Sequence, residues 1–291
     1  MQEPVFLFII HTMKHQTLSR FLLLWILSFV LTHTSQAMDT LRVLAIGNSF
    51  SRDAIEYHLS DIAAADGVYI ILGNLHIGGC SLERHALNAR TDSAAYEYIK
   101  IVGGNLTNTP HTRMSTALSD EPWDYVSFQQ ASHFSGLYDT YEPYLSELTD
   151  TVLAHLPKVR QLWHMTWAYA THSTHNAFPY YGKNQMKMYK AILNTCQQVH
   201  HNYPKMVIIP TGTAIQNARA YLGDTLNRDG FHLDYVIGRY TAAATWWEIL
   251  SKKDIRRNGY RPEGITDEQF TACRKAAHKA AIGMDVVRSK K

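Results

Sequence analysis

Cysteine is scarce in this chain of 291 residues, and the patterns that bind metals or nucleic acids are missing. Cys80, Cys196 and Cys273 form no CxxC pair and allow one disulfide at most, so we expect them to be small buried residues. The sixteen histidines are scattered and show no HExxH spacing. The net charge is only +3, and no block of lysine and arginine stands out. We therefore expect no metal, no organic cofactor and no nucleic-acid partner.

An apolar run near the N-terminus has the character of a targeting signal. Lys14 and Arg20 precede the apolar residues 21–31, and Ser35-Gln36-Ala37 offers a small-residue cleavage site. The run is too short to span a bilayer comfortably, and no cysteine lies near Ala37 to carry a lipid anchor. We predict a signal peptide over residues 1–37 and a domain over residues 38–291. This mature chain would be secreted or periplasmic, with no stable membrane span.

Five apolar segments with the composition of buried strands alternate with segments of helical character. The predicted strands cover residues 41–46, 68–72, 123–128, 159–165 and 206–210. The predicted helices cover residues 52–65, 139–156, 180–201, 237–250 and 266–287, the last opened by a Thr266/Gln269 capping box. Residues 83–122 give a weak pattern, interpreted as partly helical over 86–102 and as a loop over 103–113. The alternation predicts a single α/β domain with three layers (α/β/α) around a five-stranded parallel sheet.

Polar residues and glycines gather where these strands end, which is where parallel sheets bind ligands. Ser49 follows the first strand on a strand-to-helix turn, a position typical of a helix N-cap and of a nucleophile. Gly78-Gly79 follows the second strand and serves either a turn or a backbone donor. Gln129-Gln130 follows the third and offers side-chain amides, for loop hydrogen bonding or for an oxyanion.

Two further groups belong to the same edge of the sheet. Asp229 and His232, three residues apart, can together take the proton of a serine and hold the imidazole tautomer. The loop 166–182 is rich in aromatic residues, which suit the C–H faces of sugar rings or a small satellite core. For substrate binding we expect Trp167, Tyr169, His164 and Gln130.

Together the motifs resemble the SGNH (GDSL-type) hydrolase superfamily. Its blocks correspond to Gly47-Asn48-Ser49-Phe50, to Gly79 or Gly78, and to Asp229-Gly230-Phe231-His232. The stretches GNSFS, IGGCSLE, WDYVSFQQAS and RDGFHL look more closely like a secreted bacterial branch of largely uncharacterised SGNH-like domains. The resemblance implies a flavodoxin-like fold and a catalytic Ser49, Asp229 and His232, with the N–H groups of Ser49 and Gly79 stabilising the oxyanion.

The chain departs from the superfamily pattern at two places. Asn48 replaces the usual aspartate before the serine, and no GxND block follows the third strand. The asparagine of that block is normally an oxyanion donor, so we expect the amide of Gln129, or less readily that of Gln130, to replace it.

The expected function is that of a serine esterase, acting through an acyl-enzyme on an ester carried by a carbohydrate or polysaccharide. The ester is an O-acetyl group or a uronic-acid methyl ester, and a cation near Ser49, such as Arg52 or Arg84, would favour the methyl ester. The alternatives are a non-catalytic glycan-binding protein on the same scaffold and an acyltransferase.

Overall fold

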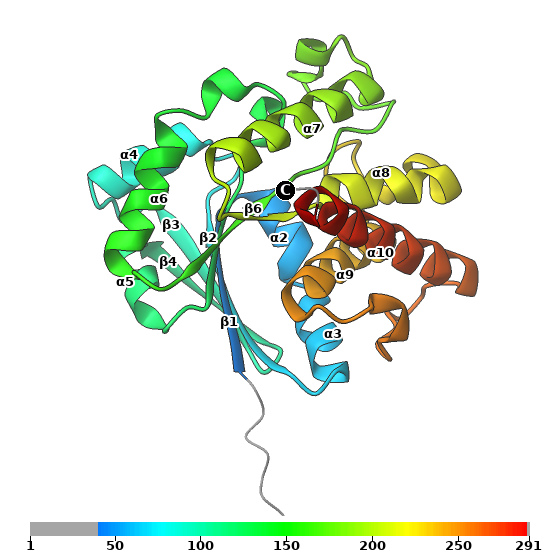
Figure 1. Cartoon of the computed structure of the whole chain (residues 1–291), viewed down its shortest axis with the longest axis horizontal. Helices are drawn as coiled ribbons and strands as arrows, with labels where there is room; N and C mark the ends of the chain where they lie inside the picture. The colour runs from blue at the N-terminus through cyan, green and yellow to red at the C-terminus, as the bar shows by residue number, and fades with distance from the viewer. Residues whose placement is uncertain (1–39, 290–291) are drawn as a thin grey trace, which may run out of the picture. The chain divides into compact units, whose positions relative to one another are not determined.

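The computed structural model describes residues 40–289 (Figure 1). The predicted signal peptide, residues 1–37, lies outside the described residues. No helix within residues 40–289 is long and apolar enough to cross a membrane.

Within residues 40–289, seven strands form one mixed sheet in the order β4-β3-β2-β1-β5-β6-β7. The strands are β1 (Thr40–Gly47), β2 (Tyr69–His76), β3 (Tyr96–Val102), β4 (Asn105–Thr112), β5 (Tyr125–Phe128), β6 (Arg160–His164) and β7 (Val207–Ile209). Five of them, β2-β1-β5-β6-β7, run parallel, and the order of the chain reverses at β1. The α/β class and the five predicted parallel strands are thus confirmed, in the flavodoxin-like order.

Strand β1 lies at the centre of the sheet because its residues are apolar on both faces. Residues 43–47 are buried, and β1 pairs with β2 on one side and with β5 on the other. A strand covered on both faces requires such a continuous apolar run. Its carboxyl end is therefore the reversal point of the sheet, where open α/β folds leave a crevice.

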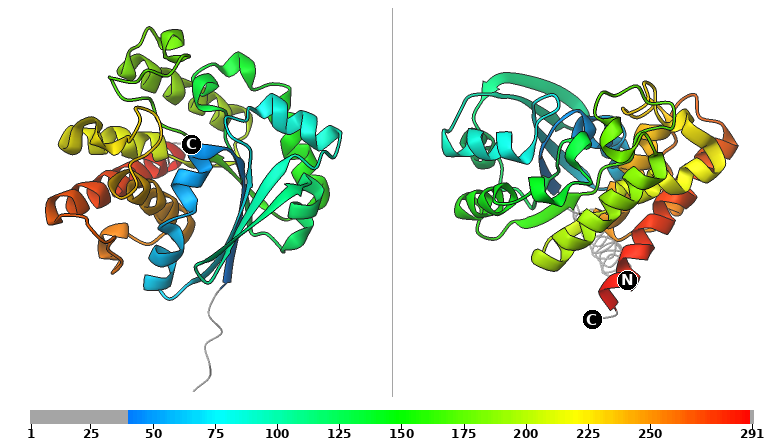
Figure 2. Two further views of the ribbon diagram at one scale, coloured as in Figure 1. Left: turned by 180° about the vertical axis from the view of Figure 1, so that it is seen from behind. Right: turned by 90° about the horizontal axis from the view of Figure 1, so that it is seen from above.

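Helices cover both faces of the sheet, so the three predicted layers are present (Figures 1 and 2). One face carries α4 (Leu82–Arg90), α5 (Met114–Asp120), α6 (Tyr144–His155) and α7 (Gln185–Asn202). The other carries α2 (Ser49–Ile55), α3 (Leu59–Ala65), α8 (Thr211–Leu222), α9 (Ile237–Ser251) and α10 (Asp267–Ser289). The Thr266/Gln269 capping box predicted at the start of α10 forms, with reciprocal hydrogen bonds of 3.1 and 3.2 Å.

The prediction of a purely parallel, five-stranded sheet is wrong, because β3 and β4 add an antiparallel hairpin beyond β2. Gly103 and Gly104, with φ of +57° and +79°, form its two-residue turn. Residues 105–111 of β4 are exposed and mostly polar, so they lack the apolar alternation by which strands are recognised. The helical interpretation of residues 96–102 is also wrong, because these residues form β3, the first strand of this hairpin.

Two predicted boundaries also change. Strand β2 continues to His76, past the expected end at Leu72, because Gly73 leaves room for the packed side chains of Leu44 and Trp123. The helix predicted over residues 52–65 is two helices, α2 and α3, separated by a bend at residues 56–58. All three cysteines are buried, as expected, and none of them forms a disulfide.

Candidate active site

Ser49 is the first residue of α2, directly after the carboxyl end of β1. The preceding Asn48 caps the helix, because its side-chain oxygen accepts a 3.0 Å hydrogen bond from Phe50 N. Gly47 permits the sharp turn, since a Cβ at this position would collide with the Ser51 side chain. The cap is thus supplied by Asn48, and the Ser49 hydroxyl is left for another partner.

The loop before α9 supplies that partner. His232 Nε2 lies 2.9 Å from Ser49 Oγ, and His232 Nδ1 lies 2.6 Å from Asp229 Oδ2. Burial raises the pKa of the Asp229 carboxyl. The hydrogen bonds from the His232 ring and from the N–H groups of His232 and Phe231 outweigh that effect, so its pKa lies below the ordinary value. An ionised Asp229 accepts a hydrogen bond from the Nδ1–H group of His232, which leaves Nε2 as the acceptor for the Ser49 hydroxyl.

The turn after β2 presents backbone N–H groups to the same pocket. Gly79 adopts a φ of +64°, a left-handed conformation that glycine takes without strain. Within residues 40–289, no acceptor bonds the N–H group of Gly78 or Gly79, and both glycines line the pocket beside Ser49. Asn48 holds this turn, because its Nδ2 donates a 3.0 Å hydrogen bond to Cys80 O. One buried amide therefore caps α2 with its oxygen and fixes the Gly78-Gly79 turn with its nitrogen.

The pocket in front of Ser49 has a volume of about 650 Å³. Its walls combine Phe134, Tyr180 and Phe231 with several histidines, of which His133 and His175 stack at 6.2 Å between ring centroids. Burial lowers the pKa of both histidines; the His175 ring lowers that of His133 further, and the His232 ring lowers that of His175. The part of the pocket around these two histidines is thus aromatic and carries little positive charge at neutral pH.

Trp167 and Tyr169, which we expected to bind substrate, lie behind the pocket wall. Both are completely buried. Trp167 stacks on Phe50 at 4.2 Å and donates to Phe231 O at 2.7 Å, whereas the Tyr169 hydroxyl bonds Ser132 Oγ at 2.8 Å. These two rings support the residues that line the pocket, so the satellite-core interpretation of the loop applies to them.

The structure also directs the amide of Gln129 away from the pocket, contrary to the expected oxyanion role. Gln129 is 1% exposed; its Nε2 donates to Asn48 Oδ1 at 2.6 Å and its Oε1 lies 2.8 Å from His164 Nδ1. Phe50 N–H fixes Asn48 Oδ1 as an acceptor, which in turn fixes the orientation of the Gln129 amide. His164 must therefore carry its proton on Nδ1, and this fully buried ring is a structural partner of Gln129.

Gln130 is likewise committed to the protein. Its Oε1 accepts from Leu82 N and Ala131 N, and its Nε2 donates to Thr140. Neither Gln130 nor His164 lines the pocket, so their expected role in substrate binding is not supported. Burial, which the sequence pattern does not report for residues at a strand end, is the reason for all of these corrections.

Replacement of Gln129 by alanine should lower the stability of the protein. The change leaves the buried His164 Nδ1–H without an acceptor and removes one donor from Asn48, at a cost of about 1–3 kcal/mol in the free energy of unfolding. Urea denaturation of the variant and the wild type measures this difference. A large loss of kcat at unchanged stability would instead indicate that the Gln129 amide stabilises the oxyanion, as first expected.

Asp53 is a site residue that the sequence analysis missed. It is 1% exposed and accepts from Leu233 N at 2.8 Å, from Arg228 at 3.0 Å and from Arg239 at 2.8 Å. Because Leu233 follows His232, this carboxylate holds the His232 loop against α2. The one sequence signal that could have identified Asp53 is a charged residue on the side of a helix that faces the core.

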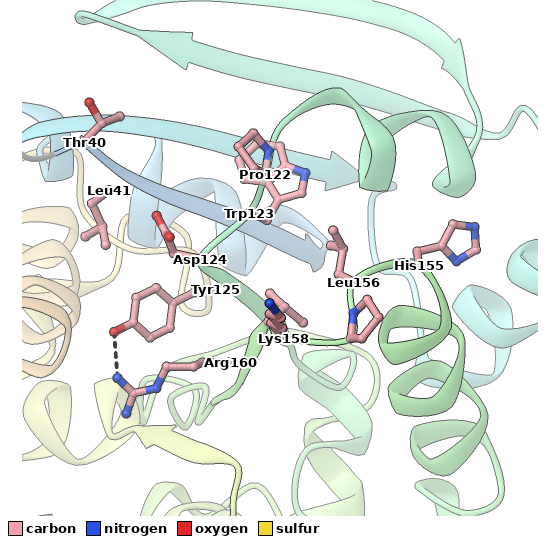
Figure 3. A pocket seen from close by; sticks show the side chains of 12 residues that line it. Thr40, Leu41, Pro122, Trp123, Asp124, Tyr125, His155, Leu156, Lys158 and Arg160 are labelled. Carbon is pink, nitrogen blue, oxygen red and sulfur yellow. Dashed lines mark hydrogen bonds between the residues drawn. The ribbon is translucent and has the colours of Figure 1, made fainter.

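Two other features lie outside this pocket. A cavity of about 700 Å³ lies at the opposite edge of the sheet, where β1, β5 and β6 begin, and the Arg160 side chain bonds the Tyr125 hydroxyl at 3.1 Å there (Figure 3). Among the described residues, the one cluster with metal-ligand chemistry is Glu248, Asp254 and His278, and His278 Nδ1 already bonds Glu248 at 2.6 Å. Neither feature contains a residue that lines the pocket in front of Ser49.

The strand order and the position of Ser49 define the fold of the SGNH (GDSL-type) hydrolases. One similar solved structure is a candidate SGNH hydrolase from Slackia heliotrinireducens, with 21% identity, a TM-score of 0.50 and coverage of 74% of this chain and 98% of that chain. Another is a candidate GDSL-like lipase from Parabacteroides merdae, with 14% identity, a TM-score of 0.50 and coverage of 74% and 98%. At these identities the likeness shows the fold alone.

The chain belongs to the DUF4886 family, described as a domain of unknown function, whose model matches residues 42–280. A solved DUF4886 family protein from Bacteroides uniformis is 47% identical, with a TM-score of 0.83 over 85% of this chain and 96% of that chain. A comparison with curated proteins gives no match.

Proposed function

We propose that this protein is a serine esterase that hydrolyses an ester carried by a carbohydrate or polysaccharide. The observation that carries the proposal is the unbroken series of contacts from Asp229 through His232 to Ser49, at 2.6 and 2.9 Å, at the mouth of a pocket of about 650 Å³. A cap or a surface turn needs no such series, because Asn48 already caps α2.

In the proposed reaction, Ser49 Oγ attacks the ester carbonyl while His232 Nε2 takes its proton. The negative charge that develops on the carbonyl oxygen is stabilised by the N–H groups of Ser49 and Gly79, at the N-terminus of α2 and in the adjacent turn. The C–O bond of the ester then breaks, and His232 returns the proton to the leaving alcohol. Water hydrolyses the acyl-enzyme by the same steps in reverse, and Ser49 is regenerated.

Support for a carbohydrate substrate comes from the aromatic side chains that line the pocket. Phe134, Tyr180 and Phe231 offer ring faces of the kind on which the C–H faces of sugars stack. We further propose that the protein acts outside the cytoplasm, as a secreted or periplasmic enzyme, because residues 14–37 have the pattern of a cleaved signal.

Incubation of the purified protein with acetylated and with methyl-esterified polysaccharides tests the function. We expect release of acetate or of methanol while the sugar backbone stays intact, as measured by enzymatic assay of both products. Hydrolysis of p-nitrophenyl acetate is a separate check of the reaction centre. Absence of turnover on all three kinds of ester would contradict the proposal.

A further inference from the structure

One end of the pocket carries a polar group of residues close to Ser49. Arg52 lies three positions after Ser49 on α2, so the two side chains share a helix face, about 5–6 Å apart at Cβ. Arg52 lines the pocket together with His76, the last residue of β2. Glu97 of β3 stands next to both, 3.6 Å from Arg52 Nη2 and 3.7 Å from His76 Nδ1.

His76 has unsatisfied hydrogen-bonding capacity in this pocket. The residue is only 9% exposed, and neither ring nitrogen has a hydrogen-bond partner within residues 40–289. The separation of 3.7 Å from Glu97 is longer than a hydrogen bond. Because buried polar atoms without partners are costly, the two ring nitrogens of His76 have hydrogen-bonding capacity left for a ligand group at the pocket wall.

The charges of this group cancel. Arg52 is held by Glu56, at 3.2 Å from Nε, and by Glu97. Burial raises the pKa of Glu56, but Arg52 and Glu97 alone already sum to zero. Burial, and then the charge of Arg52, lower the pKa of His76, so its ring is uncharged at neutral pH. The group therefore offers no net attraction to a carboxylate or a sulfate.

The same residues do offer both donors and acceptors. The guanidinium donates, the carboxylate accepts, and a neutral imidazole does one with each nitrogen. A sugar hydroxyl donates and accepts as well, so adjacent hydroxyls match this set. Arg84, the other cation near Ser49 in sequence, bonds Asn88 and does not line the pocket.

We propose that Arg52 and His76, with Glu97 beside them, form a subsite that binds the hydroxyl groups of an uncharged sugar next to Ser49; this rests on the esterase function proposed above. The substrate class is then an O-acylated neutral sugar, in preference to an esterified sugar that also carries a carboxylate.

The test measures binding separately from hydrolysis. In a Ser49→Ala background, calorimetric titration compares the 2-O-, 3-O- and 4-O-acetylated methyl glucopyranosides with the matching methyl glucuronopyranosides. We expect the neutral sugar to bind roughly tenfold tighter, a ratio that corresponds to 1.4 kcal/mol. Glu97→Gln in the same background should reduce this preference to about threefold or less, because it uncovers the charge of Arg52.

Glu147→Gln is the matched control, since Glu147 is also 3.6 Å from an arginine, Arg90, outside the pocket. It should leave the preference unchanged. Equal or tighter binding of the acidic sugar, or a preference that Glu97→Gln does not alter, overturns the subsite. Turnover of the three kinds of ester by the wild type decides the esterase function independently. A protein that binds the neutral sugar but hydrolyses none of them would keep the subsite and lose the function.

Discussion

Replacing Ser49 by alanine should abolish ester hydrolysis, with kcat reduced on the order of 10⁴-fold or more. The reason is that Ser49, His232 and Asp229 act as a unit in the proposed mechanism. The fold should remain intact. Asn48 supplies the cap of α2, and the Ser49 hydroxyl bonds His232 at a half-buried position, so its removal leaves no buried polar atom of the core unpaired. Turnover of p-nitrophenyl acetate and of the best acetylated saccharide, together with the midpoint of thermal unfolding, measures both effects.

Ser81→Ala provides the matched control, because Ser81 does act as a cap. Its Oγ accepts from Arg84 N at 3.3 Å at the start of α4. Loss of this cap should cost about 1 kcal/mol of stability with little change in turnover. The two serines thus separate a reacting hydroxyl from a capping one. Turnover near the wild-type value in Ser49→Ala, or a fall in its stability as large as that of Ser81→Ala, would contradict the assignment.

The parallel part of the fold could be predicted because its strands are buried on both faces. Residues 43–46 of β1 and 70–72 of β2 are continuous, buried apolar runs, a composition that few other structures explain. The β3–β4 hairpin could not be predicted from the sequence, because β4 is a polar edge strand. Its pairing depends on backbone hydrogen bonds rather than on a buried face.

The same distinction separates the parts of the site. Ser49 and Gly79 follow directly after strands, so their position at one edge of the sheet follows from topology alone. The direction of the Gln129 amide depends on what it contacts, namely Asn48 and His164, which lie far away in the sequence. The prediction that Trp167 binds a sugar was wrong because the sequence does not show whether an aromatic ring on a loop packs inward, as this one does.

Asn48 leads to the second large effect. Asn48→Asp, which introduces the residue usual in SGNH hydrolases, should lower kcat by roughly 10²–10³-fold, the cost of one misplaced oxyanion donor. The Asn48 Nδ2 group donates to Cys80 O, and a carboxylate oxygen in its place would face that carbonyl oxygen as a second acceptor. The turn that carries Gly79 would then lose its link to Ser49. The hydrogen bonds from Phe50 N and Gln129 Nε2 persist, so the start of α2 should stay folded.

The pH dependence of Asn48→Asp distinguishes this mechanism from simple damage. Burial at 1% exposure and the facing carbonyl oxygen raise the pKa of the introduced carboxyl group, whereas the hydrogen bonds from Phe50 N and Gln129 Nε2 lower it. Below that pKa the protonated acid donates to Cys80 O and restores the link, whereas above it the link is absent. The ratio of variant to wild-type kcat should therefore rise as pH falls, measured on p-nitrophenyl acetate. A ratio that stays constant with pH, or a variant as active as the wild type, would mean that Gly79 is positioned without the Asn48 amide.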